Sequence, residues 1–186
     1  FLSQFPNYSK EVIGGNEQLV TLFLTSFSFG IGIGSLFCER LSGHKVEMGL
    51  VPFGALGLTW FGIDLFLATP AVKAENVIGA FAFLQTFAGW RIAADLFFLG
   101  LFGGFFIVPL YALIQFRSDE MYRSRIIAGN NIINALFMVL SAVLAVVLLK
   151  VGLTIPQLLF AAAIFNAAVA LYIFTLVPDF FVRFSL

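Results

Sequence analysis

Residues 126–150 read IIAGNNIINALFMVLSAVLAVVLLK, and the final lysine is the only charged residue in this segment. Within it, residues 142–149 are AVLAVVLL, which shows neither the alternation of a β-barrel strand nor the polar stripe of a soluble amphipathic helix. A helix satisfies its own backbone hydrogen bonds in lipid, and about 20 apolar residues cross a hydrocarbon layer of roughly 30 Å. The segment therefore predicts a membrane-spanning helix.

Other long segments of the chain have the same character. Of the 186 residues, 61% are hydrophobic and only 11% are charged, and the mean hydropathy is +1.03. The predicted fold class is therefore an all-α membrane protein. The expected spans cover residues 18–37, 48–66, 90–114, 126–150 and 156–177.

Arginine and lysine are distributed unevenly between the breaks that separate these spans. Short cytoplasmic loops carry more of these residues than external loops do. If the spans alternate in direction, the richer side is predicted to be cytoplasmic, which places residues 1–17 outside. The basic residues expected on the cytoplasmic side are Arg40, Lys45, Arg117, Arg123, Arg125 and Arg183, and those on the opposite side are Lys10, Lys73, Arg91 and Lys150.

Two regions outside the spans bear on the architecture. Residues 1–5 can be the last turn of an earlier span, which would make a sixth. Residues 77–89 are apolar and uncharged, so they are expected either to form a short helix at the interface or to extend the third span outward. An odd number of spans beginning outside fits a six-span half whose first helix is mostly missing, and many transporters are built from two such halves. We therefore expect the chain to be part of a longer protein.

Ionisable residues in or beside the spans are the first candidates for function, because a charge inside a bilayer is costly. Arg91 and Asp95 are four residues apart and share one face of a helix. The pair permits three interpretations, namely a structural ion pair, a role in substrate or proton coupling, and exposure at the interface. Asp64, near the outer end of the second span, is expected to be exposed.

Amides inside the expected spans are the second group of candidates. Asn130, Asn131 and Asn134 open the fourth span, and Asn130 and Asn134 share a face. Buried amides bond to another helix or line a wet cavity, and both alternatives apply also to the lone Asn166 of the fifth span. We count Asn130, Asn131 and Asn134, together with Arg91, Asp95 and Asp64, as candidates for a substrate pathway.

Small residues recur at a spacing that brings helices together. Gly30 with Gly34, and Gly100 with Gly104, have the GxxxG spacing that lets two helix backbones approach closely. Either tight packing or a surface along which helices slide during transport would use them. Pro109, inside the third span, removes a backbone hydrogen bond and favours a kink.

The break after the first span has the most distinctive local pattern. Gly34, Glu39, Arg40, Gly43 and Lys45 combine a small-residue helix end, an acid–base pair, a glycine turn and a further cation. An acid at this position can bond to neighbouring helix ends in one conformational state and release them in another. The alternative interpretation is a solvated loop that obeys the cytoplasmic bias.

These residues resemble the major facilitator superfamily, whose loop motif reads G-x-L-x-D-R-x-G-[RK]-[RK]. A narrower similarity, to the lysophospholipid transporter branch, rests on VPLYALIQ at 108–115, on RSRIIA at 123–128, on NNIINALFMV at 130–139 and on CERLSG at 38–43. The resemblance covers essentially the whole chain, from the end of the seventh family helix to the twelfth. It implies the C-terminal six-helix half of a major facilitator fold, with five full transmembrane helices present.

The resemblance also implies a function. The chain would be part of a secondary transporter that moves lysophospholipid across the bacterial inner membrane for re-acylation, by alternating access. Its partners would be membrane lipids, the missing N-terminal six-helix half and an acyltransferase, because some members are fused to that enzyme and residues 176–184 look like the junction. The alternatives are an exporter of drugs or small solutes from the same superfamily, and a membrane anchor for a fused acyltransferase.

Several other functions are not expected. The chain has one cysteine, Cys38, and no Cys/His cluster with metal-ligand spacing, so neither a metal nor another cofactor is predicted. The formal net charge is zero, which gives no reason to expect a nucleic-acid partner. No His-x-x-x-x-Asp pattern or nucleophile–base motif is present, so no enzyme activity is expected within these residues.

Overall fold

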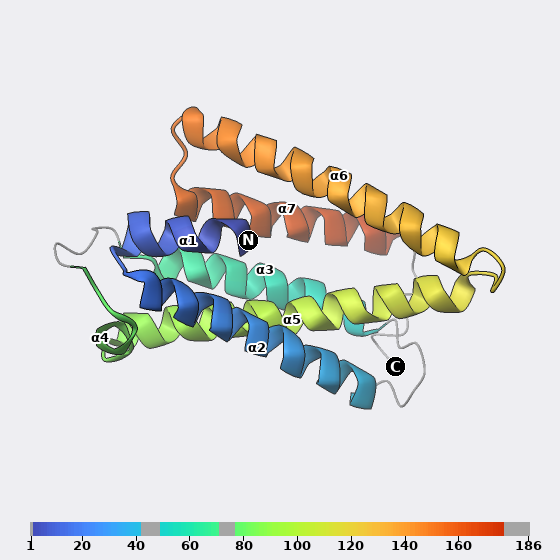
Figure 1. Cartoon of the computed structure of the whole chain (residues 1–186), viewed down its shortest axis with the longest axis horizontal. Helices are drawn as coiled ribbons and strands as arrows, with labels where there is room; N and C mark the ends of the chain where they lie inside the picture. The colour runs from blue at the N-terminus through green and yellow to red at the C-terminus, as the bar shows by residue number, and fades with distance from the viewer. Residues whose placement is uncertain (1, 42–48, 71–76, 177–186) are drawn as a thin grey trace.

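In the computed structural model, which describes residues 2–41, 49–70 and 77–176, the chain is a bundle of helices (Figure 1). The one β-type pairing among the described residues is an isolated parallel bridge between Gly15 and Ile78. The helices, in chain order, are η1 (Leu2–Gln4), α1 (Phe5–Asn7), the π-helix η2 (Tyr8–Ile13), α2 (Glu17–Leu41), α3 (Leu50–Ala68), α4 (Ala80–Leu84), α5 (Phe87–Arg117), α6 (Arg123–Lys150) and α7 (Ile155–Leu176).

The five long helices, α2, α3, α5, α6 and α7, are each long and apolar enough to cross a membrane. They coincide with the five predicted spans, so the predictions of an all-α fold and of a multi-pass membrane protein are confirmed for the described residues. The largest difference is at the end of α2, which continues to Leu41 instead of ending at residue 37. A boundary set by hydropathy ends where charges begin, whereas the helix itself continues into the interface.

For the region before α5, the sequence predicted either a short helix or an outward extension of the third span, and the structure has both. Residues 80–84 form the short helix α4, and α5 begins at Phe87, three residues before the predicted start at 90. The two helices are separated at Thr86, whose backbone is extended and whose hydroxyl accepts a hydrogen bond from the Gly89 amide at 3.0 Å. A threonine at this position satisfies one of the free amides at the start of a helix.

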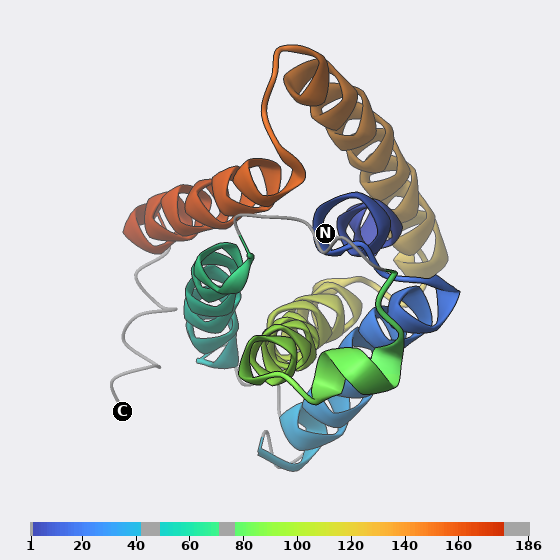
Figure 2. The same cartoon turned by 90° about the vertical axis from the view of Figure 1, so that its left-hand side faces the viewer.

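The N-terminal segment is helical well beyond Phe5, where the sequence predicted the end of an earlier span. Helical structure continues to Ile13 and stops at Gly14, whose φ of 85° suits a residue without a side chain. Phe5, Tyr8 and Ile13 are buried in the largest apolar cluster of the bundle. Figure 2 shows this segment in the middle, among the long helices. Residues 2–13 therefore occupy a core position.

Helix α5 packs against α2 along the predicted glycines. A Cβ at Gly30 would collide with the carbonyl oxygen of Phe97, and one at Gly34 with that of Leu101. On the facing helix, a Cβ at Gly100 would collide with the carbonyl oxygen of Phe27. The two backbones are thus in direct contact, which confirms tight packing at both GxxxG sites. Because residue numbers rise together along the contact, α2 and α5 are parallel and their last residues lie at the same end of the bundle.

Helix α3 runs antiparallel to α5 on another side of it. Gly54 faces the backbone of Phe106, and Gly57 faces the ring of Phe102. Helix α7 in turn packs on α3, where the Asn166 amide donates to the Ala55 carbonyl at 3.0 Å and to the Thr59 hydroxyl at 2.9 Å. Asn166 therefore holds two helices together, as one of the two sequence-based alternatives proposed.

Helix α6 stands apart from the others. None of its residues from Arg123 to Lys150 is buried, and Figures 1 and 2 show it at the edge of the bundle. A side-chain hydrogen bond connects α6 to α5, in which the Asn134 amide donates to the Tyr111 hydroxyl at 2.9 Å. The rest of α6 presents apolar side chains outward, among them Leu136, Phe137 and Leu144.

The helix directions agree with the predicted alternation of the spans. Arg40 and Arg117, in the last turns of the parallel helices α2 and α5, lie at one end of the bundle, and α6 begins there with Arg123. Lys10, Arg91 and Lys150 belong to the opposite end. The assignment of the first end to the cytoplasm remains a prediction, and we call the opposite end the outer end. Lys45, Lys73 and Arg183 lie outside the described residues.

Candidate functional site: a polar cluster at the outer end

Arg91 on α5 binds Asp64 on α3. Its Nε donates to Oδ2 at 3.0 Å, and its Nη2 donates to Oδ1 at 2.5 Å, which is a two-point contact between a guanidinium and a carboxylate. Of the three interpretations of Arg91 and Asp95, the direct ion pair is therefore not observed, because Arg91 pairs with Asp64. The expectation that Asp64 is exposed is wrong, since only 28% of its side chain is accessible. The reason is the antiparallel packing of α3 and α5, which places Asp64 level with Arg91, whereas Asp95 lies one turn deeper.

Asp95 is the most deeply placed charged residue of this end. It is 3% exposed, and its Oδ2 has no hydrogen-bond partner. Ile92, Leu96 and Leu99 of the same helix are fully buried beside it. The carboxyl group is nevertheless close enough to Asp64 and Arg91 to interact with both. A buried carboxyl without a full set of partners is costly in its charged form, and this marks Asp95 as a functional candidate.

A tyrosine and a threonine complete the cluster, and the sequence analysis did not identify either. The Tyr8 hydroxyl lies 2.7 Å from the Thr69 hydroxyl, which itself donates to the Leu65 carbonyl at 2.7 Å. The Thr69 proton is therefore in use, and Tyr8 is the donor to Thr69. Tyr8 also lies close enough to Asp95 to interact with it. No local signal predicts this contact, because it depends on the N-terminal segment entering the core.

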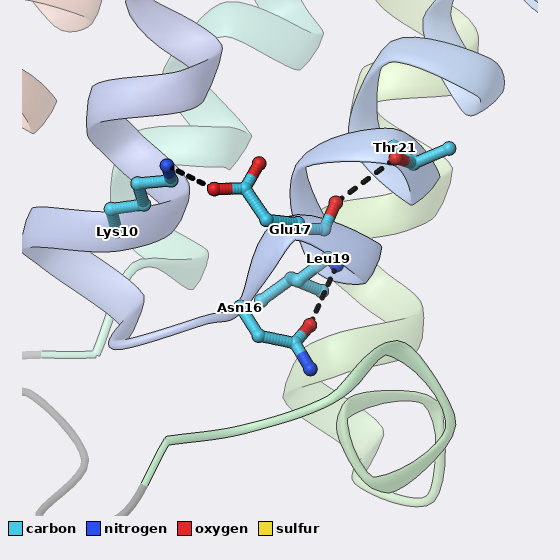
Figure 3. A network of polar contacts seen from close by, with 5 residues as sticks. All are labelled: Lys10, Asn16, Glu17, Leu19 and Thr21. Atoms are coloured by element: carbon cyan, nitrogen blue, oxygen red, sulfur yellow. Dashed lines mark hydrogen bonds and ion pairs between the residues drawn. The ribbon is translucent and has the colours of Figure 1, made fainter.

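Polar contacts surround the connection between η2 and α2 (Figure 3). Lys10 pairs with Glu17 at 2.6 Å across the connection. The Asn16 side chain accepts a hydrogen bond from the Leu19 amide at 3.2 Å, which caps the start of α2. The backbone of residues 14–16 also pairs with Ile78. These contacts tie η2, α2 and the segment before α4 together at the outer end.

The predicted amides are not part of this cluster. Asn130, Asn131 and Asn134 lie in the first half of α6, which begins at the other end of the bundle. Asn130 is half-buried, whereas Asn131 and Asn134 are exposed. The structure thus brings together Arg91, Asp64 and Asp95 among the pathway candidates and leaves the amides on a separate helix.

The structure describes only part of the predicted motif after the first span. Gly34 lies within α2 and belongs to the contact with α5. Arg40 is exposed and lines a groove of about 240 Å³ with Ile33, Leu36 and Phe37, all on one face of α2. Glu39 is exposed and takes part in an interaction within the structure. Gly43 and Lys45 lie outside the described residues, so a state-dependent contact of Glu39 with neighbouring helix ends stays a prediction.

Comparison with known proteins finds no matching family model, no matching curated protein and no matching solved structure. Within the described residues, no group of three or more His, Cys, Asp or Glu side chains is placed to hold a metal ion.

Proposed function

We propose that this chain is the C-terminal half of a secondary transporter of the major facilitator type, which moves lysophospholipid across the bacterial inner membrane for re-acylation by alternating access. The observation that carries the proposal is the isolation of α6. This helix can span the membrane, yet none of its residues is buried and it lies at the edge of the bundle.

Asn130 and Asn131 show why lipid alone is a poor neighbour for this helix. At a rise of about 1.5 Å per residue, Asn131 lies roughly 12 Å from the start of α6 at Arg123. An amide within the hydrocarbon layer costs free energy unless another helix or water satisfies it. A second group of helices packed against α6, with a wet path between the two groups, would meet this need, and it is what a two-half transporter supplies.

The N-terminal segment supports the same architecture. Residues 2–13 are helical, reach the outer end and contribute Phe5 and Tyr8 to the core. A helical segment in that place, packed among the long helices, is compatible with the six-helix half that we propose.

The lysophospholipid assignment rests on the resemblance of the sequence to that branch. The chain offers two kinds of surface that such a substrate needs, an apolar one for the acyl chain and a charged one for the head group. Phe61, Phe98 and Phe102 form an aromatic stack between α3 and α5, and Arg91 with its two carboxylates lies above it toward the outer end. An exporter of hydrophobic solutes would share the first surface.

The test is transfer of labelled lysophospholipid in liposomes that contain the full-length protein, beside a known lysophospholipid flippase as a positive control. We expect the protein to move the label to the protected leaflet. Failure to do so while the control works would refute the substrate assignment.

A competition assay separates the two remaining alternatives. If hydrophobic cations are transported and displace lysophospholipid, the exporter is favoured. If neither is transported and an acyltransferase still needs this region to reach the membrane, the chain is an anchor.

A further inference from the structure

A pocket lies at the outer end, between η2 and the connection that joins α6 to α7 (Figure 1). Its volume is about 420 Å³, and small-molecule sites typically have roughly 300–1,000 Å³. None of the described residues that line it belongs to the outer cluster. The pocket is therefore a second candidate site, separate from the cluster around Arg91.

The pocket has an apolar floor and a polar rim. The floor is buried or half-buried and includes Val12, Leu149 and Ile155. The rim is exposed and consists of Asn7, Glu11 and Thr154. A pocket that combines an apolar surface with a few polar groups suits a molecule that has both a hydrocarbon part and a polar group.

The charge of the rim comes from Glu11. Among the described residues its carboxylate forms no ion pair. The neighbouring Lys10 is directed across the connection to Glu17, which it binds at 2.6 Å (Figure 3). Lys150, at the end of α6, is exposed and is not one of the residues that line the pocket. The rim is therefore negative, and the oxygens of Asn7 and Thr154 can accept further hydrogen bonds from a cation.

Hydrogen bonds hold the α6–α7 side of the pocket in its shape. The Thr154 amide donates to Oε1 of Gln157 at 2.9 Å, and the Gln157 amide donates to the Thr154 hydroxyl at 3.4 Å. This reciprocal arrangement is a capping box, and it leaves the Thr154 hydroxyl oxygen a second lone pair for a ligand. The end of α6 closes at Gly152, whose φ of 107° suits a residue without a side chain. The pocket is thus largely pre-formed, as small-molecule sites usually are.

We propose that this pocket binds the primary ammonium group of an amphipathic amine, with the ammonium at Glu11 and the hydrocarbon part on the apolar floor. A primary ammonium has three N–H donors, which match the oxygens of Glu11, Asn7 and Thr154. A quaternary ammonium has no N–H donor and is typically held by aromatic rings, and the described lining residues include no aromatic side chain.

The same cation is presented at a membrane surface by the head group of an aminophospholipid and by a free alkylamine. A ligand in contact with both walls ties η2 to the α6–α7 connection, so its binding should also raise the Tm of the protein. The site stands on the pocket itself and does not depend on the proposed transport.

The test is isothermal titration calorimetry on the full-length protein in phosphatidylcholine nanodiscs, with binding to empty nanodiscs subtracted. Three water-soluble probes share one chain length and differ in charge and donors, namely hexylammonium, hexyltrimethylammonium and hexanoate. Hexylammonium should bind most tightly, hexyltrimethylammonium more weakly, and hexanoate not measurably.

Two variants locate the binding. Glu11→Gln keeps nearly the same shape without the charge and should weaken hexylammonium binding about tenfold, because a hydrogen bond to a charged group contributes about that much. Asn7→Leu removes one acceptor and should weaken binding by a smaller factor. Glu120→Gln makes the same chemical change at an exposed acid of the opposite end, so it is the matched control and should leave the affinity unchanged. Circular dichroism shows whether each variant is folded, and the second rim variant keeps the test decisive if one is unstable.

The source of the amine is resolved by competition with dihexanoyl phosphatidylethanolamine, which carries the ammonium on a water-soluble lipid. Displacement of hexylammonium would identify a lipid head group as the ligand, and no displacement would identify a free amine; the site stands in both cases. It would be overturned if hexylammonium did not bind, if hexanoate bound equally well, or if both rim variants bound hexylammonium as tightly as the wild type.

Discussion

Gly30→Ala tests the contact between α2 and α5 most sharply, because Gly32, two residues away, is a built-in control. A Cβ at Gly30 would collide with the Phe97 carbonyl oxygen and lie 2.9 Å from the Leu101 amide nitrogen, whereas a Cβ at Gly32 has no atom within 4 Å. Overpacking of this kind costs about 1–3 kcal/mol, and Ala gains roughly 0.5–1 kcal/mol over Gly in a helix. Gly30→Ala should therefore destabilise the bundle by about 1 kcal/mol, and Gly32→Ala should stabilise it slightly.

The assay is thermal unfolding of the chain in detergent, followed by circular dichroism. For a chain of this size, 1 kcal/mol corresponds to a shift in Tm of about 2–4 °C. We expect Gly30→Ala to lower Tm by about that amount and Gly32→Ala to leave it unchanged or raise it. Equal shifts for both variants, or a higher Tm for Gly30→Ala, would show that the two backbones are not in contact at this glycine.

Three further perturbations address other contacts, each read out by the same unfolding assay. Asn166→Ala removes both hydrogen bonds from α7 to α3 and should cost about 0.6–1.7 kcal/mol, whereas Asn134→Ala on the exposed α6 should cost less; the reverse order would contradict the packing. Asn16→Ala removes the cap of α2 and should cost about 1 kcal/mol, and no loss of stability would argue against the cap. Arg91→Lys keeps the charge but cannot make the two-point contact with Asp64, so Tm should fall, and a Tm equal to that of the wild type would contradict that contact.

The spans were predictable because lipid leaves the backbone few choices. Apolar runs of sufficient length indicated each of the five long helices among the described residues, and the GxxxG spacing indicated which faces of α2 and α5 meet. The N-terminal segment was not predictable in the same way. Its helix continues to Ile13 through polar residues. Tyr8, one of these, is buried and contacts Phe23 and Thr69, which lie far away in the sequence.

The sequence indicated which residues belong to the candidate site, but not which of them form an ion pair. Scarcity of charge selected Arg91, Asp95 and Asp64, and the structure brings these three residues together at the outer end. The spacing of four residues within one helix favoured an ion pair between Arg91 and Asp95. A pattern along one segment does not show how far along the bundle Asp64 of α3 lies, so the pairing of Arg91 with Asp64 was not predicted. The antiparallel contact between α3 and α5 decides that level, and it appears only in three dimensions.

The most direct measurement of the central claim is lysophospholipid transfer by separately produced halves. Residues 1–186 and the proposed N-terminal half would be produced with different tags and reconstituted alone or together. The account predicts that the two copurify through the face of α6 and that only the combination transfers lysophospholipid. Transfer by residues 1–186 alone, or two halves that never associate, would contradict it.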